Sequence, residues 1–221
     1  MNRNGKWAGL IVFVLFAGAA SSGQMMHSRP PQFQGVWNPV VGRGAAYQLT
    51  GGSGKNSEIE ISIVGKEPVD GKDGYWMEMA FSSSDMGGQM LIKHLFVLDG
   101  QQTRTAKMIM QMPGHPPMEM PAQMMHRENS AQAADIRTDA QDLGSESLTV
   151  PAGTFATEHY RTKDGADMWI AKDVPPWGLV KYQGKDSTMI LVRLVSDAKD
   201  KIVGTPQPFN PMMMGQHPDH Q

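Results

Sequence analysis

Residues 58–81, "EIEISIVGKEPVDGKDGYWMEMAF", contain the clearest strand pattern in the chain. From Glu58 to Ile63, isoleucine alternates with polar residues, and from Tyr75 to Phe81 every second residue is aromatic or methionine. An alternation with a period of two predicts half-buried β-strands. The intervening Asp70–Gly74, "DGKDG", has the composition of a turn. This stretch therefore predicts two neighbouring strands that share an apolar face.

The same alternation runs through most of the chain. "MLIKHLFVL" (90–98) and "RTAKMIMQM" (104–112) flank Asp-Gly, a strong hairpin signal. In the second half, further alternating runs are separated by short turns: "FATEHYR", "ADMWIA", "GLVKY" and "TMILVRLV". About nine or ten strands joined by short turns predict a mainly β fold, with a single antiparallel curved sheet or half-barrel. We expect one domain over residues 36–204.

Two stretches depart from this rhythm. Residues 113–144 begin with prolines at positions 113, 116, 117 and 121, which oppose a hydrogen-bonded ladder, and continue with a helix-forming composition. We expect a loop or short-helix insertion there, covering one face or end of the sheet. Residues 205–221, "TPQPFNPMMMGQHPDHQ", predict a disordered tail rich in Met, His and Pro.

The N-terminus has the pattern of an export signal. Arg3 and Lys6 precede an apolar run of 14 residues, "WAGLIVFVLFAGAA", which small residues follow. This run is shorter than the roughly 20 residues that span a bilayer. We therefore predict a signal peptide over residues 1–23, a flexible segment over 24–35, no integral membrane segment in the mature chain, and a periplasmic or secreted location.

Composition excludes several classes of function. The chain has 20 Lys and Arg against 22 Asp and Glu, so it offers no basic footprint for nucleic acid. It has no cysteine, which excludes disulfides, thiolate catalysis and cysteine-ligated metal sites. His94 and His159 lie on predicted strands without a nucleophile nearby in sequence, and Glu158-His159 could meet Asp167 across the 163–165 turn as a cross-strand pair. The sequence thus predicts a protein that is not an enzyme and needs no cofactor.

Methionine is the unusual feature, with 19 residues in the chain. In a strand, Met-x-Met places both side chains on one face, and methionine packs pliably around varied partners. The predicted hydrophobic ligand-binding face consists of Met77, Met79, Phe81, Phe96, Met108, Met110, Met112, Met118 and Met120. The same residues could instead fill an ordinary packed core.

A second hypothesis assigns the methionines to a soft metal. Thioethers and imidazole select Cu(I) or Ag(I) over hard cations. The candidate ligands are Met108, Met110, Met112, His115, Met124, Met125 and His126. Against this hypothesis, the first three follow Ala106 on one side of a strand, as core residues do. A third hypothesis is a structural or interaction protein of the cell envelope.

Two segments of the second half carry a family resemblance. They are "VPAGTFATEHYR" (150–161) and "DMWIAKDVPPWGLVK" (167–181), which follow "GAAYQL" and residues 58–81. Together these stretches resemble uncharacterised exported bacterial proteins of the broad LolA/LppX-like group. The resemblance implies a curved antiparallel sheet or half-barrel whose concave face is covered by helices and receives acyl chains. It implies a periplasmic binding protein for a hydrophobic ligand or a lipidated partner. This chain has fewer helical candidates than such carriers.

Overall fold

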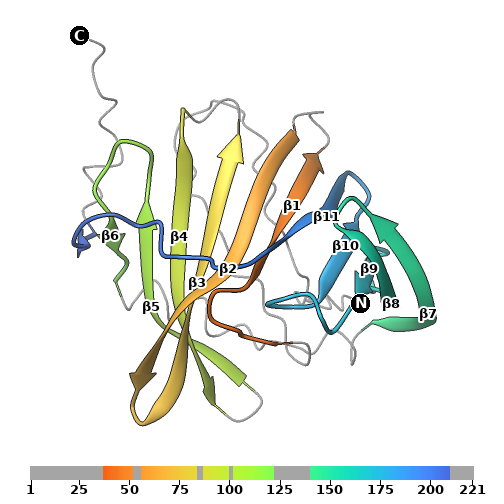
Figure 1. Ribbon diagram of the computed structural model, residues 1–221, viewed down its shortest axis with the longest axis horizontal. Coiled ribbons are helices and arrows are strands. Elements are labelled where there is room, and N and C mark those ends of the chain that lie inside the picture. The colour runs from red at the N-terminus through yellow and green to blue at the C-terminus, as the bar shows by residue number, and fades with distance from the viewer. Residues whose placement is uncertain (1–36, 52–55, 84–86, 100–101, 122–139, 210–221) are drawn as a thin grey trace, which may run out of the picture.

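The protein is one open, mixed sheet of twelve strands (Figure 1). A computed structural model describes residues 37–51, 56–83, 87–99, 102–121 and 140–209, and these contain no helix. The sheet does not close into a barrel, and all neighbouring strands are antiparallel except one pair at an edge. The predicted mainly β fold with a single sheet is confirmed. The predicted signal peptide (1–23) and the segment 24–35 lie outside the described residues.

The first six strands form a meander in which each pairs with the next. They are β1 (Gly44–Gly51), β2 (Asn56–Val69), β3 (Lys72–Ser83), β4 (Gln89–Asp99), β5 (Gln102–Gln111) and β6 (Met118–Glu119). Residues 58–81 lie in the β2–β3 hairpin, whose two-residue turn is Asp70-Gly71 between Val69 and Lys72. Both turn residues have positive φ, 51° and 76°, which aspartate and glycine tolerate better than other residues.

The next five strands form a second meander. They are β7 (Gln141–Val150), β8 (Gly153–Arg161), β9 (Asp167–Ile170), β10 (Leu179–Gln183) and β11 (Ser187–Val195). Among the described residues, the two meanders are joined by a single ladder between β1 and β11, in which Tyr47 faces Leu191. Cα atoms of β7 also approach β11 within 8 Å, although three strands separate them in the sheet. The second meander is therefore strongly curled.

After β11 the chain returns across the first meander. The blue segment of residues 196–206, called the C-terminal strap here, runs from β11 to β6 (Figure 1). Its backbone N–H groups bond to the carbonyl of Gly42 (2.9 Å), the carboxylate of Glu78 (3.0 Å) and the side-chain oxygen of Gln111 (3.2 Å). The strap therefore covers the side of the sheet that carries Glu78, called the outer face.

The strap ends in β12 (Gln207–Pro208), which pairs in parallel with β6. Two expectations are corrected here: the prolines near residue 118 do not prevent a ladder, and the tail predicted to be disordered from 205 begins with a strand. The reason is local, because proline removes only its own N–H. Gln207 and Phe209, which flank Pro208, donate to the carbonyls of Pro117 (2.9 Å) and Glu119 (3.1 Å).

The insertion predicted over 113–144 also contains strand residues. Its described parts are 113–121, with β6, and 140–144, where β7 begins at Gln141. The described parts hold no helix, and residues 122–139 lie outside the described residues.

The core lies on the side of the sheet opposite the strap, called the core face. Fully buried side chains from both meanders meet there, among them Tyr47, Ile61, Leu179 and Leu191. The hydroxyl of Tyr47 donates to the carbonyl of Leu179 at 3.0 Å, which links β1 to β10. Burial raises the pKa of Tyr47 well above its ordinary value. The two meanders thus share one apolar core.

Candidate functional site

The methionines of the first meander form rows across the core face. In antiparallel strands, residues directly opposite each other point to the same side, with Cβ atoms about 4.5–5.5 Å apart. One row is Ile63, Met77, His94 and Met108, and the next is Ile61, Met79, Ile92, Met110 and Met118. The apolar residues that alternate along each strand in the sequence therefore lie side by side across neighbouring strands of the sheet.

Burial divides the predicted ligand-binding residues into two groups. The buried group is Met77, Met79, Phe96, Met108 and Met118. The half-buried group, called the methionine rim, is Phe81, Met110, Met112 and Met120. Met120 lies beside Met108, whose carbonyl accepts its backbone N–H at 2.9 Å. The rim therefore extends the packed core toward solvent around β3, β5 and β6.

The predicted metal ligands are brought together only in part. Met108 and Met110 share the core face, and Met112 follows the end of β5. His115 lies in the turn beyond, where its backbone N–H bonds to the carbonyl of Met112 at 3.1 Å. Met124, Met125 and His126 lie outside the described residues. The part of the chain that the structure describes holds no group of three or more His, Asp or Glu side chains placed to hold a metal ion.

His94 also lies on this face, although it is not among the predicted ligand-binding or metal-binding residues. His94 is buried between Met77 of β3 and Met108 of β5, and its ring stacks on Phe96 with centroids 5.4 Å apart. Its Nδ1 has no hydrogen-bond partner among the described residues. Burial lowers the pKa of His94 to about 4, so the imidazole is neutral at pH 7. The signal was present in the sequence, because His94 alternates in phase with Ile92 and Phe96.

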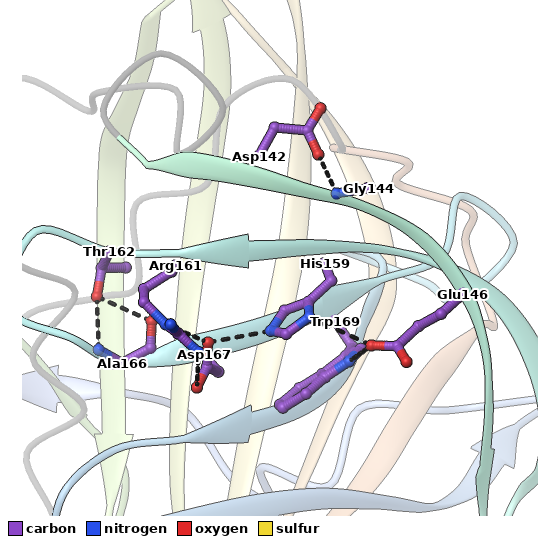
Figure 2. A network of polar contacts seen from close by, with 9 residues as sticks. All are labelled: Asp142, Gly144, Glu146, His159, Arg161, Thr162, Ala166, Asp167 and Trp169. Atoms are coloured by element: carbon purple, nitrogen blue, oxygen red, sulfur yellow. Dashed lines mark hydrogen bonds and ion pairs between the residues drawn. The ribbon is translucent and has the colours of Figure 1, made fainter.

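A second histidine anchors a polar network on the curled meander (Figure 2). His159 of β8 stacks on Trp169 of β9, with ring centroids 4.3 Å apart. Its Nε2 lies 3.0 Å from Oδ1 of Asp167, which confirms the expected cross-strand pair. Its Nδ1 lies 3.2 Å from Oε1 of Glu146, a residue of β7 that also accepts from the Trp169 indole. The network therefore joins three strands.

Asp167 is held between the side chains of Arg161 and His159. Arg161 donates to both of its carboxylate oxygens, at 2.9 and 3.2 Å. Burial opposes ionisation of Asp167, but the hydrogen bonds from Arg161 and His159 outweigh it and hold the pKa below its ordinary value. Both ring nitrogens of His159 face carboxylates, those of Glu146 and Asp167. This arrangement is suited to holding strands together.

A third polar group lies under the strap on the outer face. The carboxylate of Glu78 is buried, and it accepts from the backbone N–H of Lys201. Burial, supported by the adjacent Asp200, raises the pKa of Glu78 to about 7. Lys93 pairs with Asp200, and Lys201 pairs with Glu60 at 2.6 Å. These contacts attach the strap to β2, β3 and β4.

Comparisons with known proteins find likeness only among solved structures. No family model matches the chain, and no curated protein matches it. A candidate lipoprotein from Parabacteroides distasonis is 12% identical with a TM-score of 0.37, over 73% of this chain and 99% of that one. An exported protein of YmcC-like fold from Bacteroides fragilis is 12% identical with a TM-score of 0.35, over 74% of this chain and 99% of that one. Likeness at this level carries no argument about function, and the resemblance to the LolA/LppX-like group stays a prediction.

Proposed function

We propose that the protein is an exported, non-catalytic binding protein that binds or carries a hydrophobic ligand or a lipidated partner in the periplasm. The site of binding is the methionine rim, Phe81, Met110, Met112 and Met120. The export signal in the sequence supports the location. No helix among the described residues is long and apolar enough to cross a membrane.

The observation that carries this proposal is the graded burial of the core face. Met108 and Met118 are buried, whereas the neighbouring Met110 and Met120 are partly exposed to solvent. Half-buried thioether side chains are pliable, and they can repack around an acyl chain or another apolar group. A ligand there would extend the core instead of requiring a preformed polar site.

The non-catalytic part of the proposal is supported by the state of the polar groups. His159, which has the Asp partner typical of a catalytic base, directs both ring nitrogens at carboxylates. His94 is buried in the core, away from solvent-borne substrates. The contacts of Glu78 and Asp200 attach the strap to the sheet.

Native mass spectrometry of the exported full chain, purified without detergent, tests whether a lipid accompanies it. The delipidated protein is then titrated with N-phenyl-1-naphthylamine, an apolar fluorescent dye. We expect dye binding to weaken at least tenfold in the Met110→Gln/Met112→Gln variant. The reason is that removing a polar amide from water costs free energy that removing an apolar thioether does not. The matched control is Leu194→Gln, which alters an apolar side chain of β11 that is 44% exposed. A protein that carries no lipid and takes up no dye, or whose double variant binds as the wild type does, contradicts the proposal.

A further inference from the structure

The row of side chains around His94 has the composition of a soft-metal site. His94 is 2% exposed, and the residues directly opposite it on the two neighbouring strands are Met77, 0% exposed, and Met108, 4% exposed. Two thioethers and one imidazole therefore point to the same side of three adjacent strands. The sequence alone separates these residues by 17 and 14 positions, and only the register brings them together.

The imidazole in this row has an unsatisfied nitrogen. Nδ1 of His94 is buried and lacks a hydrogen-bond partner among the described residues, although nearly all buried polar atoms in proteins have one. The pyrrole-type N–H or the lone pair at that atom is thus left without a partner in an apolar core. An unmatched polar atom of this kind is a recognised sign of an ion or water in the native site.

We propose that Met77, His94 and Met108 form a three-coordinate site for a soft monovalent cation, Cu(I) or Ag(I). Thioether sulfur and neutral imidazole are the donors that select these ions. The row contains no carboxylate, so it offers nothing to balance a divalent charge in a buried position. Metal–ligand bonds of about 2.0–2.3 Å around a trigonal centre place the donor atoms about 3.5–4 Å apart. His94 lies on the strand between Met77 and Met108, about 4.8 Å from each neighbouring strand, and long, flexible thioether side chains can converge on an imidazole at that distance.

The methionine rim supplies a route from solvent to this site. Met110 lies on the same face of β5 as Met108, two residues further along the strand, and Met120 lies beside Met108 through its backbone hydrogen bond. Both are half-buried. A soft ion can therefore pass from half-buried thioethers to buried ones without meeting a carboxylate along the row. The metal site itself consists of the buried residues Met77, His94 and Met108, so its test does not depend on whether the rim binds an apolar ligand.

The test is anaerobic competition of the full-length protein for Cu(I) against a chromophoric Cu(I) chelator. We expect one tight site in the wild type, weakened at least tenfold in Met77→Leu, in Met108→Leu and in His94→Phe. Leucine conserves volume, so the methionine variants should keep the fold. The matched control is Met189→Leu, which changes a methionine that is equally buried in the core on β11 and should leave affinity unchanged. The Met- and His-rich tail is present in every variant, so differences among variants report the row.

A second measurement covers the case in which a variant fails to fold. In the wild type, Ag(I) should shift the imidazole nitrogen resonance of His94 in NMR spectra at a ratio of one ion per chain. Unperturbed His94 resonances overturn the proposal. A Met77→Leu/Met108→Leu variant that folds and binds Cu(I) as tightly as the wild type also overturns it.

Discussion

His94 and His159 lie in similar places on their strands but in opposite environments. Each is in the interior of a strand, and each stacks its ring on an aromatic side chain, Phe96 or Trp169. On the core face, His94 lies between two thioethers, and its Nδ1 has no partner among the described residues. On the second meander, both nitrogens of His159 face carboxylates. The comparison shows that the neighbouring strands, and not the local sequence, decide what a strand histidine does.

The largest effect should come from removing packing next to His94. Met77→Ala deletes a side chain that is fully buried, and we expect it to cost about 2–5 kcal/mol of the free energy of unfolding. Met112→Ala at the half-buried rim should cost about 1 kcal/mol or less, since solvent can fill the space. Urea unfolding at pH 7, with an unchanged m-value, measures both. A Met77→Ala cost as small as that of the rim variant would mean that the region around His94 is not close-packed.

The next largest effect should be a loss of stability at acid pH that comes from the buried His94. The folded-state pKa of His94 is about 4, below its ordinary value of 6.5, so the unfolded chain binds the proton first. In the metal-free protein, the stability associated with His94 is complete above pH 6.5, and about 3 kcal/mol of it is lost as the pH falls toward 4. His94→Phe should remove this loss. The measurement is the free energy of unfolding at pH 7, 5.5 and 4.5 for both proteins.

The contribution of Glu78 to stability changes with pH in the opposite direction to that of His94, so the experiment needs a control for Glu78. Its pKa is raised to about 7 from an ordinary value of 4.5, so its contribution to stability is present below pH 4.5 and is lost as the pH rises through 7. Glu78→Gln removes that contribution, and the His94 comparison is repeated in this background. If the free energy of unfolding falls equally with decreasing pH in Glu78→Gln and in Glu78→Gln/His94→Phe, the loss of stability in acid does not come from His94.

The smallest effect should come from the network of His159. In a double-mutant cycle of His159→Gln and Asp167→Asn, we expect a coupling free energy of about 1 kcal/mol, because both side chains are partly exposed and Arg161 still pairs with Asp167. The coupling should fall as NaCl is raised, since solvent-accessible ion pairs are screened. A coupling of zero at low salt would remove the distinction between a partnered and an unpartnered histidine.

The sequence predicts the strands of this protein much better than their partners. Alternation in "EIEISIV" and "YWMEMAF" predicts the β2–β3 hairpin, and Asp70-Gly71 supplies its turn. The His159–Asp167 pair is also predictable, because a short turn brings β8 and β9 together. Local pattern carries this information, since hairpin register depends on the turn and on the alternation.

The features that the sequence does not predict depend on pairing between residues that are far apart in the sequence. Glu146 reaches His159 because β7 extends back to Gln141, in a stretch whose composition favours a loop or helix. The row of Met77, His94 and Met108 needs the registers of two hairpins at once. β12 pairs with β6 between prolines, and only the three-dimensional course of the strap shows which N–H groups remain available.

The seam between β1 and β11 has a consequence for the order of folding. Each meander consists of hairpins whose partners are close in sequence, and such contacts form early because closing a short loop costs little entropy. The seam pairs Gly44 with Val195, near opposite ends of the described chain, and the strap crosses it only after β11 has been synthesised. The two halves can therefore form local structure independently, while the shared core waits for the last strand. Kinetic traps in this protein should be species with both meanders formed and an exposed, unpaired β1 edge.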